Sequence, residues 1–206
     1  MRKNVKQQLA LRVLSTAALM AMVSSIATAA FADTYDLTKG SVDILAEGGE
    51  QRITQWEDKD KGTYVTDDKG AIKNRKDTDI TLTTKDETTG KTETTSNTVT
   101  IDAKEGNTAN VTLKNVHIEV DTTDAKSGAI EIKGDGDTNL ELNGDNTVLT
   151  TNSTAEEHAA IEKADAYGTG TLTIKDDVND DGSEKTGTDA DTTGTLLAGG
   201  RRHRWR

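Results

Sequence analysis

The stretch Asn110-Val-Thr-Leu-Lys-Asn-Val-His-Ile-Glu-Val120 decides the fold of this 206-residue chain. It holds two short segments, Val111-Thr-Leu113 and Ile118-Glu-Val120, in which apolar residues alternate with a polar one. Alternation with a period of two is typical of a β-strand that buries one face. The stretch therefore predicts two short strands joined by a brief connection.

Similar segments recur along the sequence at a nearly constant interval. Those in register with Val111-Thr-Leu113 begin at residues 80, 140 and 172, which gives intervals of 31, 29 and 32 residues. A second series begins at residues 99, 130 and 161, and a third begins at residues 118 and 148. One common period for three series indicates stacked repeats, each of which is one coil with three short strands.

The repeats predict an all-β fold, a parallel β-solenoid with three short strands and about 30 residues per coil. Corners are expected at Asn, Gly and Asp, as in 134–136 and 143–145, because these residues tolerate positive φ angles. The segment 155–164 has a helix-like composition, but the repeat places Ile161 on a strand. The expected inward columns are Ile80/Val111/Leu140/Leu172, Leu82/Leu113/Leu142/Ile174 and Val99/Ile130/Ile161.

Residues 1–32 have the pattern of a secretory signal peptide. A basic start is followed by the uncharged run 13–30, and Ala30-Phe31-Ala32 offers the small residues that a signal peptidase requires. A membrane anchor is the alternative, but the run is only weakly hydrophobic. We expect cleavage after Ala32, export to the cell surface or beyond, and no membrane span in the processed protein.

The remaining sequence is expected to divide into three parts. Residues 33–69 read as an entry and capping segment with a hairpin at Gly48-Gly49, and residues 70–200 read as the coils. The tail 201–206, Arg-Arg-His-Arg-Trp-Arg, matches nothing before it. It is either a basic anchor for an anionic cell wall or the product of a shifted reading frame. The second interpretation is favoured, and it implies a protein truncated at its C-terminus.

Acidic residues dominate the sequence that follows the expected cleavage site. All 36 lie after residue 32, against 21 Lys and Arg, so this part has a net charge of −15. Such a surface repels phosphates, and nucleic acid is therefore not an expected partner. The protein has no cysteine, so an exported form of it folds without disulfides.

The repeats resemble a family of secreted bacterial carbohydrate-binding-domain proteins with a right-handed parallel β-helix, a superhelix like that of pectate lyases. The resemblance covers about residues 78–200. It implies a non-catalytic surface protein that binds polysaccharide, with calcium as an expected ligand, and it transfers no binding residue to a numbered position. It rests on the sequences of residues 110–120, Gly128-Ala-Ile-Glu-Ile-Lys-Gly134, Asn139-Leu-Glu-Leu-Asn-Gly-Asp-Asn-Thr-Val148 and Gly170-Thr-Leu-Thr-Ile174.

One acidic segment has the spacing of a calcium loop. Asp177, Asn179 and Asp181 alternate and are followed by Gly182, which matches the first half of a D-x-N-x-D-G loop. Oxygens at alternate positions can converge on one hard cation. The twelfth position is Thr188, which leaves the adjacent Asp189 as the fourth candidate ligand. A solvated acidic turn is the alternative interpretation.

Three aromatic residues are candidates for stacking against a sugar ring: Trp56, Tyr64 and Tyr167. Trp56 and Tyr64 have an alternative role, which is to cap the first coil. Together with the charge, these residues predict a secreted or cell-surface protein that binds an acidic polysaccharide such as a polyuronate. Calcium shared between protein and sugar carboxylates would reverse the local repulsion.

Two other functions are weighed against carbohydrate binding. A structural or adhesive β-solenoid stalk would have featureless surfaces, with its aromatic residues buried or scattered. A polysaccharide lyase would need a basic residue, usually Arg or Lys, beside a calcium-bound uronate, and no arginine lies between Arg75 and Arg201. The sequence therefore predicts binding without catalysis.

Overall fold

The computed structural model describes residues 33–121, 128–152, 158–163, 169–176 and 194–202. These residues form strands and loops, with one 3₁₀ turn, η1 (Leu37–Lys39), as their only helical element. The prediction of an all-β protein is therefore confirmed. No helix in the described ranges has the length and apolar content needed to cross a bilayer. The expected signal peptide and most of the basic tail lie outside these ranges.

Three sheets contain parallel strands. The first sheet consists, in spatial order, of β1 (Thr34–Asp36), β8 (Ile80–Thr83), β10 (Thr108–Lys114), β13 (Asp137–Asn143) and β16 (Leu172–Asp176). The second consists of β11 (His117–Asp121), β14 (Asp145–Asn152) and β17 (Thr195–Arg202). The parallel part of the third consists of β15 (Ile161–Lys163), β12 (Ile130–Lys133), β9 (Val99–Ala103) and β2 (Ser41–Glu47).

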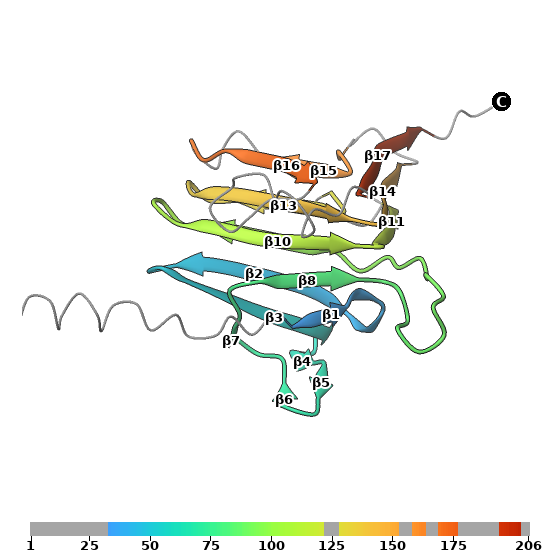
Figure 1. The fold of residues 1–206 in the computed structure, drawn as a ribbon, viewed down its shortest axis with the longest axis horizontal. Helices are drawn as coiled ribbons and strands as arrows, with labels where there is room; N and C mark the ends of the chain where they lie inside the picture. The colour runs from blue at the N-terminus through green and yellow to red at the C-terminus, as the bar shows by residue number, and fades with distance from the viewer. Residues whose placement is uncertain (1–32, 122–127, 153–157, 164–168, 177–193, 203–206) are drawn as a thin grey trace, which may run out of the picture. The chain divides into compact units, whose positions relative to one another are not determined.

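From β10 onward the polypeptide visits the three sheets in a fixed rotation, whereas in the two earlier rounds β1 is followed by β2 and β8 by β9, with no described strand in the second sheet. Between β8 and β9 a single bridge joins Thr95 to Ile118 of the second sheet. β10, β11 and β12 belong to the first, second and third sheets, and β13, β14 and β15 repeat this order before β16 and β17 begin it again. Each strand therefore lies beside its counterpart from the previous round, as Figure 1 shows for β10, β13 and β16. Parallel pairing at this sequence distance is what the 30-residue period predicts.

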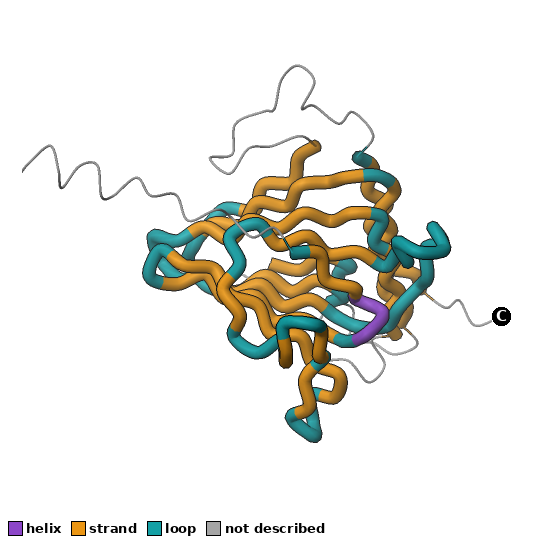
Figure 2. The backbone as a smooth tube through the Cα atoms, turned by 60° about the horizontal axis from the view of Figure 1, so that its bottom comes forward, coloured by secondary structure: helices purple, strands orange, loops and turns teal. Residues whose placement is uncertain are grey.

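Antiparallel strands extend the third sheet beyond β2. β3 (Glu50–Asp58) pairs with β2 through the turn at Gly48 and Gly49, where both glycines have positive φ. β3 in turn pairs with β4 (Thr63–Tyr64) and β7 (Arg75–Lys76), and β5 (Thr66–Asp67) forms a small hairpin with β6 (Gly70–Ala71). The strands and the teal loops of this region are traced in Figure 2. The expected hairpin at Gly48-Gly49 is confirmed.

Most of the expected strand register is confirmed. Val111 pairs with both Ile80 and Leu140. Ile130 pairs with Val99 and Ile161, and Ile118 pairs with Val148, as the other two series predict. Ile161 lies on a strand, as the repeat predicts and in contrast to the helix-like composition of its segment.

The register predicted for the last strand of the first sheet was wrong by two residues. Leu140 pairs with Ile174 rather than Leu172, and Leu172 lies opposite Thr138. A shift of two residues keeps Leu172 and Ile174 on the same face of the sheet, so the apolar pattern alone cannot detect it. A polar contact fixes the position, because Oδ1 of Asp137 accepts hydrogen bonds from the backbone N and the hydroxyl of Thr171. The expected burial of Ile174 was wrong as well, because its side chain is 39% exposed on β16, the outermost strand of the sheet.

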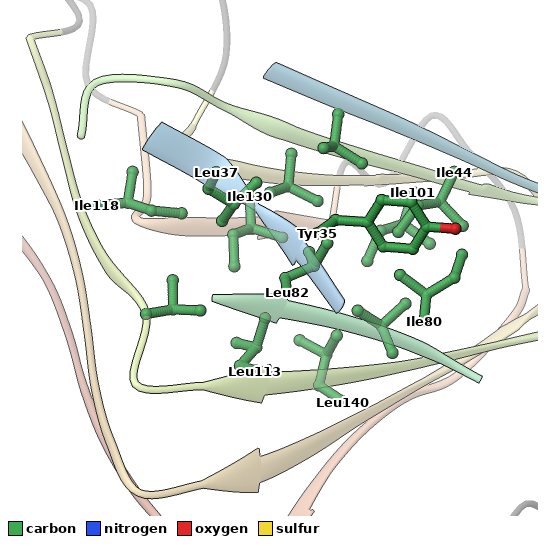
Figure 3. Close-up of a cluster of buried hydrophobic side chains, with 14 of the residues drawn as sticks. Tyr35, Leu37, Ile44, Ile80, Leu82, Ile101, Leu113, Ile118, Ile130 and Leu140 are labelled. Carbon is green, nitrogen blue, oxygen red and sulfur yellow. The ribbon is translucent and has the colours of Figure 1, made fainter. Parts of the chain in front are cut away.

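The core is a narrow set of aliphatic columns between the sheets. Inward side chains of successive strands lie against one another, and Figure 3 shows Leu82, Leu113 and Leu140 from three neighbouring strands among them. All three are fully buried. Alternating outward residues such as Thr81 and Thr112 pair across the same strands. Because aliphatic side chains are buried in these columns, a sequence with only 3% aromatic residues can still form a core.

Corners occur at two of the expected glycine and asparagine sites. Gly134 has φ 82° and Gly144 has φ 65°, both in the left-handed region that favours glycine. A Cβ on Gly134 would lie 2.1 Å from the carbonyl oxygen of Ala103 in the neighbouring coil. Glycine is therefore required there by both conformation and close packing.

Candidate functional site

Trp56 and Tyr64 form an aromatic pair on the antiparallel extension of the third sheet. Along β3, Gln51, Ile53 and Gln55 are buried, so Trp56 lies on the opposite, outward face. Trp56 and Tyr64 are directly paired across β3 and β4, which puts both rings on one face. The ring centroids are 4.7 Å apart and the planes are tilted by 34°. Both side chains are half-buried, and neither belongs to the core.

Charged groups hold the indole in place. Nε1 of Trp56 donates a 2.7 Å hydrogen bond to Oδ2 of Asp43, which lies on the adjacent strand β2. Nζ of Lys59 donates a 3.0 Å hydrogen bond to the other oxygen of Asp43 and lies 5.9 Å from the indole centroid. The orientation of Trp56 is thus set before any ligand arrives.

A second lysine lies over the phenol ring. Nζ of Lys73 is 4.9 Å from the ring centroid of Tyr64, within the range of a cation–π interaction. Lys59, Trp56, Tyr64 and Lys73 therefore form one continuous set of contacts in which each aromatic ring has its own ammonium group.

A hollow of about 440 Å³ lies beside Tyr64, and Trp56 is not among its lining residues. Its lining includes Tyr64 together with one acidic, one basic and one hydroxyl-bearing residue. These are the groups that can accept from or donate to the hydroxyls of a small polar ligand. The lining residues are Lys39, Glu57, Tyr64, Val65 and Thr66.

A second hollow, of about 270 Å³, lies near the turns of the β2–β3 hairpin and of residues 106–108. It is lined by small and polar residues and by no aromatic ring. The side chain of Gln51, in its wall, bonds to the main chain of Asn110 through both its amide nitrogen and its oxygen, at 2.9 and 2.7 Å. Since this amide holds the two segments together, the hollow is a weaker candidate than the one beside Tyr64.

The structure brings together two of the three candidate aromatic residues. Trp56 and Tyr64 are in contact, whereas Tyr167 lies outside the described residues. Asp177, Asn179, Asp181 and Asp189 of the expected calcium loop also lie outside them. Within the described part of the protein, no group of three or more His, Asp or Glu side chains is arranged to hold a metal ion.

Besides the other residues that line the hollow, three residues that contact the aromatic pair were missed in the sequence: Asp43, Lys59 and Lys73. Lys59 lies in the charged run that separates the two aromatic residues, so its proximity could have been expected. Asp43 and Lys73 are brought to the site by the pairing of β2 with β3 and by the residues that follow β6. No local sequence signal identifies contacts of that kind.

The sequence and structure match no protein-family model, no curated protein and no solved structure with which they were compared.

Proposed function

We propose that this protein is an exported, non-catalytic carbohydrate-binding protein with a right-handed parallel β-helix fold. The observation that carries the proposal is the half-buried Trp56–Tyr64 pair, with a polar hollow beside Tyr64. The β-helix is supported by the parallel strands of three sheets, which the polypeptide visits in rotation from β10 to β17. The resemblance of residues 78–200 to secreted carbohydrate-binding-domain proteins points to the same function.

An aromatic platform with polar groups at its edge suits a sugar. One face of a pyranose ring presents C–H groups that pack on an aromatic ring, while its hydroxyls point outward and require donors and acceptors. Trp56 and Tyr64 supply the rings, and Glu57, Lys39 and Thr66 supply the polar groups around the hollow. Because the indole of Trp56 is already held in place, it loses little conformational entropy when a sugar binds.

The lysines make an acidic sugar the preferred ligand. A cation–π contact at an exposed site is worth about 0.5–1 kcal/mol, so a sugar can displace Lys73 from Tyr64 at little cost. The displaced ammonium can then pair with a uronate carboxylate. Calcium at the Asp177 loop would be a second means of holding such a polymer, by bridging carboxylates of protein and sugar.

Affinity electrophoresis of the exported protein in gels that contain polygalacturonate or a neutral polysaccharide tests the proposal. Retardation by the acidic polymer is expected, and Trp56→Ala or Tyr64→Ala should abolish it. Thr112→Ala is the matched control, because Thr112 lies on the outward face of β10 in a different sheet.

The gels also separate the alternatives. Retardation that survives a chelator supports direct contact with the lysines, and retardation that requires calcium supports the bridging ion. If neither polymer retards the protein with or without calcium, carbohydrate binding is refuted and the structural stalk is favoured.

A further inference from the structure

Asp33, the residue that follows the expected cleavage site, is held by three contacts. Its backbone N donates a 3.2 Å hydrogen bond to Oδ2 of Asp77. Its carbonyl accepts a 3.2 Å hydrogen bond from the backbone N of Thr81 on β8. Its carboxylate lies 2.6 and 2.7 Å from Nζ of Lys69. The first residue after Ala32 is therefore fixed in place through both its backbone and its carboxylate.

The carboxylate that faces this nitrogen is buried. Asp77 is only 3% exposed. Besides the bond from Asp33, the carboxylate of Asp77 accepts a 2.9 Å hydrogen bond from the hydroxyl of Tyr35 and a 3.0 Å hydrogen bond from the backbone N of Asp79. All three donors are uncharged while Asp33 is joined to Ala32. A buried carboxylate with neutral partners alone is costly, and burial raises the pKa of Asp77 above its ordinary value.

We propose that cleavage between Ala32 and Asp33 creates an α-ammonium group that forms an ion pair with the buried carboxylate of Asp77. The reaction is the hydrolysis of one peptide bond by a signal peptidase. Water supplies the hydroxyl that completes the carboxyl group of Ala32, and the nitrogen of Asp33 keeps its place and gains protons. Processing thereby supplies the counter-charge that Asp77 lacks in the precursor.

The geometry needs no rearrangement for this pair to form. The nitrogen that becomes the ammonium is already 3.2 Å from Oδ2, inside the distance of an ion pair. An ion pair that is largely buried is screened less by solvent than the surface pairs of this protein. Because β1 is the outermost strand of its sheet, the pair would fasten that strand to the segment before β8. This inference does not depend on carbohydrate binding.

Other charged groups surround the proposed pair. The positive charge of Arg75 influences the pKa of Tyr35, but the guanidinium is already paired with the carboxylate of Asp67. The carboxylate of Asp33 is paired with the ammonium of Lys69. The titratable groups in this network of contacts are Tyr35 from β1, Asp33 itself, Asp67 and Lys69 from the β5–β6 region, Arg75 from β7, and Asp79, which contacts Asp77 through its backbone N.

The pair predicts a pH signature. An α-amino group ordinarily has a pKa of about 7.7–8.0, and a neighbouring carboxylate raises it. A group whose pKa is raised in the folded state stabilises the fold below its unfolded pKa. That contribution is lost as the pH rises through the folded pKa. The stabilisation by processing should therefore be full near pH 7 and disappear at alkaline pH.

The test begins with the N-terminal sequence of the protein purified after export of the full-length precursor, which should start at Asp33. The α-amino pKa is then measured by NMR after isotopic methylation of the amine. It should lie above the ordinary range in the parent and fall in Asp77→Asn. Asp68→Asn, which removes an exposed charge nearby, is the matched control and should leave it unchanged.

A second preparation keeps Asp77 and carries one extra glycine before Asp33, so that the ammonium moves one residue away. Its melting temperature should be lower than the parent's at pH 7 and equal to it at alkaline pH. A first residue other than Asp33, an α-amino pKa unaffected by Asp77→Asn, or equal melting temperatures at pH 7 would each overturn the proposal.

Discussion

Asp43 and Trp56 lie on adjacent antiparallel strands, and Oδ2 of Asp43 accepts the hydrogen bond of the indole Nε1 at 2.7 Å. The same carboxylate pairs with Lys59, which lies over the indole ring. One carboxylate thus controls both the orientation of the aromatic platform and the position of a cation beside it.

Replacing Asp43 by alanine should weaken polysaccharide binding without unfolding the protein. The indole would lose its acceptor, with a stability loss of about 1 kcal/mol, and Lys59 would lose its partner. Binding is measured by affinity electrophoresis and stability by urea unfolding. Asp43→Asn is the control, because it keeps an acceptor for the indole but removes the ion pair. Binding by Asp43→Ala equal to that of the parent would contradict the positioning role of Asp43.

Replacing Gly134 by alanine should destabilise the protein more than the same change at Gly62. Both glycines have positive φ, so both variants acquire backbone strain of roughly 1–2 kcal/mol. Only at Gly134 does the new Cβ meet a backbone atom, 2.1 Å from the oxygen of Ala103, whereas Gly62 has no atom within 4 Å. The clash should add about 1–3 kcal/mol to the loss, measured by urea unfolding. Equal losses would show that the coils are not in close contact at this corner.

The pair between Asp67 and Arg75 predicts an acid-sensitive contribution to stability. The guanidinium donates to Oδ1 of Asp67 at 2.8 Å and lowers the pKa of that carboxyl to about 2. A carboxyl with a lowered folded pKa stabilises the fold above its unfolded pKa of about 3.9. This stabilisation is lost as the pH falls from about 5 toward 2.

Melting temperatures of the parent and Asp67→Asn should therefore differ at pH 6 and converge near pH 2. Asp68→Asn, at an exposed position next to Asp67, should show no such convergence. A constant difference across this range would mean that the ion pair does not contribute.

Calcium is expected to raise the melting temperature of the exported protein. An ion held by Asp177 and its neighbours would stabilise the folded state by mass action. The increment should disappear when Asp177→Ala and Asp181→Ala are combined. An increment that persists in the double variant would place the ion elsewhere, and no increment in the parent would identify the segment as an ordinary acidic turn.

The core could be predicted from the sequence because its signal is local. Each inward pair such as Val111 and Leu113 shows the alternation on its own, and the common period aligns one coil with the next. The alternation is unchanged by a shift of two residues, so it could not predict that Leu140 pairs with Ile174 rather than with Leu172. The bond between Asp137 and Thr171 that sets this register is polar, and the apolar pattern does not contain it.

The candidate site could be predicted only in part for a different reason. Trp56 and Tyr64 attract notice as rare aromatic residues in an acidic protein. Their contacts with Asp43 and Lys73 arise from antiparallel pairing in a region that has no repeat. Strand β1 was missed likewise, because three residues are too few to show a period.

The antiparallel pairing of β3 with β2 has a consequence for the behaviour of the protein at high concentration. A free edge of a parallel sheet exposes unpaired N–H and C=O groups, which can recruit strands from other molecules and start a fibre. The hydrogen-bonding edge of β2 is already taken by a strand that runs the other way, with charged Glu50, Arg52 and Asp58 along it. Another molecule therefore cannot add a parallel strand directly to β2, and fibre growth from that edge is prevented.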